Sequence, residues 1–182
     1  MTEPRIAPGG RSDIGWINWV IASVSGRVTG TTPPNLFRTL GRHRGLFRGW
    51  LIFAGRLMPR GKLPRRETEL VILRVAHLTG STYEFEHHVR LARRVGLRPE
   101  DINGITRPLA EGPWTEREVA ILSAVDRLHS DRDLDESSWN ALRSHLEERE
   151  CIELVMLVGH YEMLATFLHA LRIPPDPPRR GQ

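Results

Sequence analysis

The chain has 182 residues, of which 40% are hydrophobic and 26% are charged, and this composition is typical of a soluble domain with its own core. The formal net charge is +4 and the pI is near 10.1, but acidic residues stand between the dispersed arginines, so nucleic-acid binding is not expected. Cys151 is the only cysteine, which excludes an internal disulfide and a CxxC redox or zinc motif and fits a cytoplasmic protein.

The first part of the chain predicts a loose segment followed by helices. Residues 1–12 are rich in proline and glycine and are expected to be flexible. The apolar run Ile14–Val24 is too short to span a bilayer and is interrupted by Asn18, so no membrane partner is expected. No segment shows sustained strand alternation. The hydrophobic periodicity instead predicts helices at 13–27, 35–57, 64–79, 81–95, 99–105, 115–130, 136–146 and 149–171.

These helices predict an all-α, single-domain helical bundle. We assign the domain to residues 13–173. The tail at 174–182 is rich in proline, cannot continue the last helix and is expected to be disordered.

A carboxylate stands in the most apolar part of the predicted helix 64–79. Pro64 suits the first helical position and Gly80 suits a C-terminal stop. Glu69 projects among apolar residues of this helix, where an unpaired carboxylate would be costly, so we expect it to have a partner. Two interpretations stay open: a site residue, or a structural carboxylate that ties two helices together, for example through an arginine.

Three polar residues share the apolar side of helix 81–95. At about 100° per residue, Ser81, Glu84 and His88 fall on or beside the apolar stripe, whereas His87 points away from it. Glu84 and His88 are i, i+4 neighbours and are expected to hydrogen-bond directly, although a surface pair is the alternative. Ser81 is equally suited to cap the helix. Glu84 and His87 form one ExxH, the spacing of di-iron ligands, but no second ExxH exists, so no metal is expected.

Two further helices complete the prediction. Thr115 and Glu118 form a capping box that opens helix 115–130. The helix at 149–171 is very apolar and is expected to lie centrally or at an oligomer interface. It carries His160 and Tyr161, which are candidates to line the same pocket as the polar residues of helix 81–95, although a satisfied core histidine is the alternative for His160.

The stretch LPRRETELVILRVAHLTGSTYEFEHHVRLARRVGL resembles the carboxymuconolactone decarboxylase and alkylhydroperoxidase-D-like (AhpD-like) superfamily. Weaker similarity extends to WTEREVAILSAVDRLH and to GHYEMLA in the last helix. The resemblance implies an all-α fold that assembles as a trimer, a hexamer or another ring. The peroxidase branch carries Glu, Cys-x-x-Cys and His in a thiol-based proton relay. By this resemblance Glu69 and His88 match the Glu and the His, whereas Ser81 and Glu84 stand at the two cysteine positions.

The absence of both cysteines argues against hydroperoxide reduction, which needs a thiolate and a resolving thiol. The decarboxylase branch, by resemblance, carries Glu and His at the positions of Glu84 and His88. The favoured hypothesis is therefore a cofactor-free lyase or hydrolase that uses acid–base chemistry on a small organic acid or lactone, by decarboxylation, lactone hydrolysis or isomerisation. In this hypothesis His88 donates and accepts the proton, Glu84 orients the imidazole, and Glu69 relays a proton or holds the far side of the site.

Binding roles are assigned to Ser81, His160 and Tyr161, and neither a cofactor nor a metal is expected. The expected partners are a small-molecule substrate and further copies of the chain. The alternative hypothesis is an AhpD-like, peroxiredoxin-related scaffold that has lost its redox cysteines and binds a small molecule without catalysis.

Overall fold

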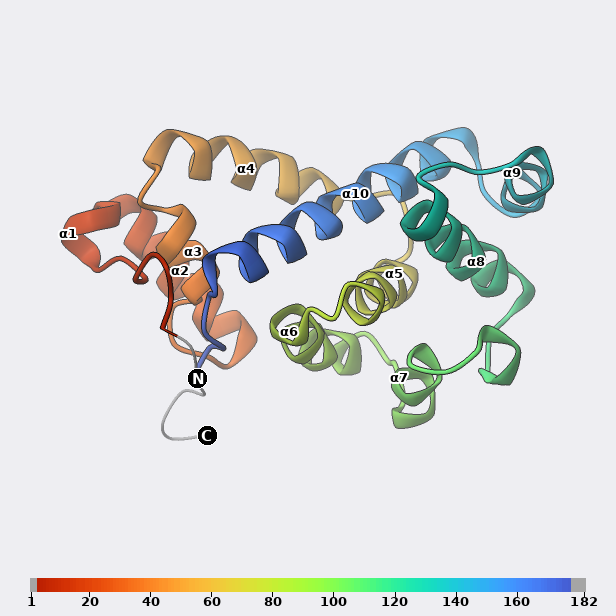
Figure 1. Ribbon diagram of the computed structural model, residues 1–182, viewed down its shortest axis with the longest axis horizontal. Helices are drawn as coiled ribbons and strands as arrows, with labels where there is room; N and C mark the ends of the chain where they lie inside the picture. Colours follow the sequence, from red (N-terminus) through yellow and green to blue (C-terminus); the bar gives the residue numbers. More distant parts are fainter. Residues whose placement is uncertain (1–2, 178–182) are drawn as a thin grey trace. The chain divides into compact units, whose positions relative to one another are not determined.

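The computed structural model describes residues 3–177, and these residues form ten α-helices and one 3-10 helix, with no β-strand. The all-α prediction is confirmed. The helices are α1 (Arg11–Ile14), α2 (Trp16–Thr29), α3 (Asn35–Leu40), α4 (Arg44–Leu57), α5 (Arg65–Leu78), α6 (Thr82–Arg94), α7 (Pro99–Ile105), η1 (Leu109–Glu111), α8 (Glu116–Asp131), α9 (Glu136–Arg143) and α10 (Glu148–Leu171), as labelled in Figure 1.

The chain forms two compact units. Among the described residues, one contains 3–55 and 166–177, and the other contains 56–165. The assignment of 13–173 to one domain stays a prediction.

Both ends of the first unit make contacts in the described part of the chain. The backbone N–H of Gly9 donates to the carbonyl of Arg38 at 3.1 Å, within the segment predicted to be flexible. Asn35 Nδ2 donates to the carbonyls of Pro174 and Pro175, both at 3.1 Å, at the start of the predicted disordered tail. The rest of that predicted tail, 178–182, lies outside the described residues.

One predicted helix, 35–57, is wrong, because it is two helices, α3 and α4. The chain turns at residues 41–43. His43 Nδ1 then accepts the backbone N–H of Leu46 at 3.2 Å and caps the start of α4. Histidine is not among the preferred N-cap residues, so the sequence pattern did not reveal this start.

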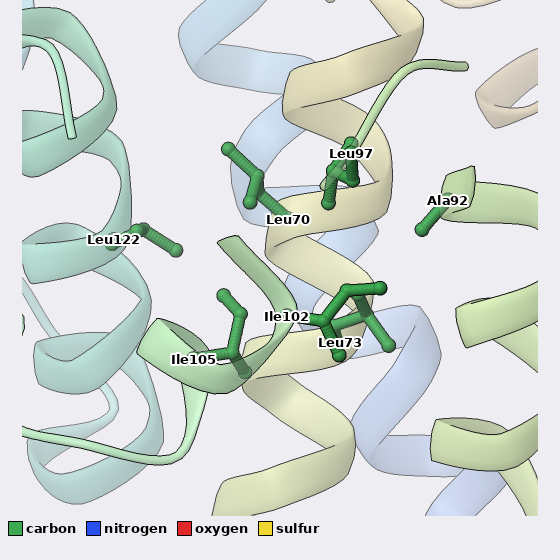
Figure 2. Close-up of a cluster of buried hydrophobic side chains, with 7 residues drawn as sticks. All are labelled: Leu70, Leu73, Ala92, Leu97, Ile102, Ile105 and Leu122. Atoms are coloured by element: carbon green, nitrogen blue, oxygen red, sulfur yellow. The ribbon is translucent and has the colours of Figure 1, made fainter. Parts of the chain in front are cut away.

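The centre of the second unit is α5, which packs against α6, α7 and α8 (Figure 1). Every α5 residue from 67 to 76 is buried, including the polar residues Glu67 and Arg74. Figure 2 shows the apolar cluster that joins these helices, formed by Leu70, Leu73, Ala92, Leu97, Ile102, Ile105 and Leu122. Burial of this surface supplies the main stabilisation of the α5–α8 group.

Arginine–carboxylate pairs fix the polar positions of the same group. Arg66 holds Asp101 of α7 with two hydrogen bonds of 3.0 and 3.1 Å, and holds Glu118 of α8 at 2.7 Å. Arg74 binds both carboxylate oxygens of Asp126 at 2.7 Å. These charge-assisted pairs tie α5 to α7 and α8.

The turn after α5 determines how α6 begins. Gly80 adopts a left-handed φ of 67°. Its N–H donates to the carbonyl of His77 at 3.1 Å, and the N–H of Ser81 donates to the carbonyl of Ala76 at 2.8 Å. These two bonds form a Schellman motif, which confirms the predicted stop at Gly80. The reversal places α6 against α5.

The long helix α10 is apolar enough, by length and composition alone, to cross a membrane. Half of its most apolar window is buried, a property that the core helices of proteins share.

The predicted capping box at Thr115 is confirmed, since Thr115 Oγ1 accepts the N–H of Glu118 at 3.2 Å.

Candidate functional site

Glu69 and His88 meet between α5 and α6. His88 Nδ1 lies 2.8 Å from Glu69 Oε2, and both side chains are buried, with Glu69 at 0% exposure. Both Glu69 and His88 therefore point inward, as predicted. The contact joins two helices that are consecutive in the chain, so the Gly80 turn is what brings the two groups together.

The second oxygen of Glu69 binds an arginine of its own helix. Arg65 Nη2 donates to Glu69 Oε1 at 2.7 Å, one turn earlier along α5. This pair supplies the partner that the burial of Glu69 required. Arg65 was missed by the sequence reasoning, although its i, i+4 spacing from Glu69 was a usable signal.

The other ring nitrogen of His88 faces α10. Tyr161 Oη lies 3.2 Å from His88 Nε2, and the two rings meet edge to face with centroids 5.2 Å apart. The Glu69 carboxylate can only accept, so His88 Nδ1 carries a hydrogen in the neutral ring. His88 Nε2 is then the acceptor, and Tyr161 donates its hydroxyl hydrogen to it. The four residues form a continuous hydrogen-bonded row, Arg65–Glu69–His88–Tyr161.

Glu84 is buried beside this row but is not part of it. Its exposure is 3%, and its Oε2 has no hydrogen-bond partner in the described residues. The predicted hydrogen bond between Glu84 and His88 is wrong, because both ring nitrogens of His88 are directed across the helix pair, toward Glu69 and Tyr161. Burial raises the pKa of Glu84 from 4.5 to about 8, so this side chain is mainly neutral at pH 7 and can donate a hydrogen bond.

Ser81 occupies the N-cap position of α6 without capping the helix. Its side chain makes no cap hydrogen bond, and its Oγ is buried with no partner in the described part of the chain. Ser81 and Glu84 are one helical turn apart. Buried polar atoms are normally hydrogen-bonded. Two unpartnered polar atoms on successive turns of one helix therefore indicate where water or a ligand binds.

The two other histidines near the row are neutral at pH 7. His160 is buried against Tyr161 with ring centroids 5.2 Å apart, and burial lowers its pKa to about 4. His87 lies parallel to the Tyr83 ring with centroids 6.4 Å apart, and burial lowers its pKa to about 3. His87 is therefore half-buried, between the apolar stripe and the solvated face of α6.

Comparison with known proteins gives a family match over part of the chain and a fold for nearly all of it. Residues 44–127 match the model of the carboxymuconolactone decarboxylase family. This match agrees with the predicted superfamily over that segment of the chain. The carboxymuconolactone decarboxylase segment contains α5 and α6 entire, and so includes Glu69, Ser81, Glu84 and His88. No curated protein matches the chain.

Solved structures with this fold include three informative neighbours. An uncharacterised peroxidase-related protein with an AhpD core from Ralstonia eutropha JMP134 has a TM-score of 0.85 at 16% identity, over 96% of this chain and 93% of its own. A protein of unknown function from Agrobacterium tumefaciens, described as a putative antioxidant defence protein AhpD, has a TM-score of 0.66 at 23% identity. The likeness covers 71% of this chain and 89% of the other chain. The debrominase Bmp8, in complex with 2,3,4-tribromopyrrole, has a TM-score of 0.80 at 17% identity. The likeness covers 93% of this chain and 90% of the debrominase chain. At these identities the likeness establishes the AhpD-like fold.

Proposed function

We propose that the chain is a cofactor-free enzyme that moves a proton on a small organic acid or lactone. The observation that carries this proposal is the row Arg65–Glu69–His88–Tyr161, in which a buried imidazole is hydrogen-bonded at both nitrogens to groups that can accept or donate. Such a row can take up a proton and return it. The match to the carboxymuconolactone decarboxylase family supports the substrate class.

Decarboxylation illustrates what the row would do. The C–C bond to the carboxylate breaks, carbon dioxide leaves, and the electron pair moves into an adjacent carbonyl to form an enolate. The enolate carbon then needs one proton. An imidazolium at His88 is the source of this proton, and the Glu69 carboxylate stabilises the charged ring before transfer. Lactone hydrolysis and isomerisation need the same uptake and return of a proton.

Glu69 replaces Glu84 in the orienting role under this proposal. Glu84, neutral at pH 7, donates a hydrogen bond to the substrate together with Ser81. The test is to incubate the purified protein with carboxymuconolactone, oxaloacetate and acetoacetate and to follow carbon dioxide release and loss of the lactone ring. Turnover above the protein-free rate supports the proposal. Binding of carboxymuconolactone without turnover of any of these compounds supports the alternative, a non-catalytic scaffold.

The same site makes a redox prediction. We expect no thiol-dependent turnover of cumene hydroperoxide, because Ser81 and Glu84 cannot form the thiolate or the resolving thiol and Cys151 is 1% exposed. A double variant, Ser81→Cys with Glu84→Cys, is expected to gain this activity, since Glu69 and His88 are already in contact. Robust peroxidase turnover by the natural chain that is lost in Cys151→Ser would contradict this prediction.

Self-association is the expected state of the chain. Four large apolar side chains of α10 are exposed at helical spacing, namely Ile152, Val155, Met156 and Met163. Gly159 lies on the same face, with no atom within 4 Å of an added Cβ, so another helix can approach closely. We expect a trimer or larger assembly in light scattering at micromolar concentration. Met156→Glu should reduce the mass, whereas Val119→Glu, at an exposed position of α8, should not. A monomer at micromolar concentration would refute the expectation.

A further inference from the structure

His88 has no free ring nitrogen in the structure. Nδ1 is bound to Glu69 at 2.8 Å and Nε2 to Tyr161 at 3.2 Å. A substrate can therefore reach a nitrogen of His88 only if one of these two partners moves away. Both partners are 5% exposed or less, and neither is on a loop.

The Tyr161 ring is held in a fixed orientation by two histidines. It meets His88 at an interplanar angle of 86° and His160 at 83°, each with ring centroids 5.2 Å apart. Its hydroxyl donates one hydrogen to His88 Nε2, which leaves oxygen lone pairs for another hydrogen bond. The hydroxyl oxygen of Tyr161 can therefore accept one further hydrogen bond.

Two unpartnered polar atoms lie on the same buried side of α6 as His88, which contacts Tyr161. Glu84 is one helical turn before His88 on α6, and after burial its charge is the largest cause that raises the pKa of Tyr161. Glu84 Oε2 and Ser81 Oγ are both buried without a hydrogen-bond partner in the residues described. Both side chains are at least nine-tenths buried, so ordinary exposure to bulk water does not satisfy them.

We propose that Tyr161, and not His88, is the catalytic residue that touches the substrate, and that His88 exchanges its proton with the substrate through the Tyr161 hydroxyl. The substrate's reacting group lies against the hydroxyl, and a carbonyl or carboxylate of the same substrate accepts hydrogen bonds from Glu84 and Ser81. This inference rests on the proposed function, because it assigns the contact residue within the same site.

The proton balance works in both directions. In the acid direction, imidazolium Nε2–H faces the Tyr161 oxygen, the Tyr161 O–H bond breaks as its proton joins the enolate carbon, and the Nε2 proton moves to the phenolic oxygen. Tyr161 ends unchanged and His88 ends neutral. In the base direction, Tyr161 takes a proton from the substrate as its own proton moves to His88 Nε2. Glu69 stabilises the imidazolium formed in this second case.

The chain offers a matched control, because it has only two tyrosines, Tyr83 and Tyr161. We expect Tyr161→Phe, which keeps the ring, to lower kcat for carboxymuconolactone by about 100-fold or more, with a smaller change in KM. Tyr83→Phe should leave kcat within about threefold of the natural chain. In protein labelled with 13C at the tyrosine Cζ, the stable lactone acid 5-oxotetrahydrofuran-2-carboxylate should shift the Tyr161 resonance saturably and leave the Tyr83 resonance in place.

The outcomes separate this inference from the proposed function. If His88→Gln removes turnover while Tyr161→Phe retains it and the Tyr161 resonance does not respond, the substrate contacts His88 directly and the inference is overturned. If the natural chain turns over none of the compounds tested, the proposed function fails. The labelled resonance then decides alone: a saturable shift supports contact with Tyr161, and no shift overturns it.

Discussion

Replacing His88 with Gln is expected to lower kcat by about 1,000-fold on whichever acid or lactone the protein turns over, with little loss of stability. Gln has nearly the volume of His and can still bind Glu69 and Tyr161, but it does not exchange a proton near neutral pH. The effect should appear in kcat, because the proton is needed during the reaction rather than for substrate binding. Steady-state kinetics and thermal unfolding of the same preparation test both parts.

Two histidines provide controls for this variant. His77 is exposed near the end of α5, and His87 lies parallel to Tyr83 on the side of α6 next to His88. His77→Gln and His87→Gln are both expected to leave kcat within about threefold of the natural chain. If His87→Gln were the damaging change and His88→Gln the harmless one, the acid–base role of His88 would have to be abandoned.

The helices were predictable from sequence wherever local chemistry set their ends. Gly80 and Thr115 mark a stop and a start by their own conformational and hydrogen-bonding preferences, and both were read correctly. The break between α3 and α4 was missed because the apolar periodicity continues through it and its cap is a histidine, His43. A pattern of apolar residues reports which side of a helix is buried, but it does not report a short turn that keeps the same phase.

The inward direction of Glu69 and His88 was also predictable, because helical phase determines direction. The partner of His88 was not. Phase placed Glu84 next to His88 along α6, but the imidazole turns toward α5 and α10, where Glu69 is 19 residues away and Tyr161 is 73 residues away in the chain. Which of several inward groups pair depends on how the helices pack, and that is a property of the whole fold rather than of one segment.

Ionisation of Glu84 is expected to change the free energy of unfolding strongly with pH. The direction of this change follows from the pKa of Glu84. Burial raises the pKa of Glu84 from 4.5 to about 8 in the folded chain, whereas the unfolded chain ionises near 4.5. Below about pH 4.5 both states are protonated, so the stability associated with this proton is fully present. As the pH rises toward 8, the unfolded state releases the proton and the folded state keeps it, so stability is lost at about 1.4 kcal/mol per pH unit. The total loss is of the order of 5 kcal/mol, reached as the pH passes the folded value.

The variant Glu84→Gln isolates this effect, because Gln keeps the volume and stays neutral at every pH. The free energy of unfolding of the natural chain, minus that of Glu84→Gln, is expected to fall steadily from pH 5 to pH 8 in urea titrations. His87 and His160, with pKa values lowered to about 3 and about 4, destabilise both proteins as the pH falls below 6.5, so their contribution cancels in the difference. Glu86→Gln, at an exposed position of α6, is the matched control.

A difference in unfolding free energy that does not change between pH 5 and pH 8 would show that Glu84 is ionised in the folded chain, and its role as a hydrogen-bond donor would then fail.

If the difference falls as expected, ionisation of Glu84 should also lower turnover at high pH. Above about pH 8 a charged Glu84 can no longer donate to a substrate carbonyl or carboxylate, and it repels an anionic substrate. Turnover of an organic acid should therefore decline above this pH in the natural chain, and in Glu84→Gln the decline should disappear, because the Gln amide donates a hydrogen bond at every pH.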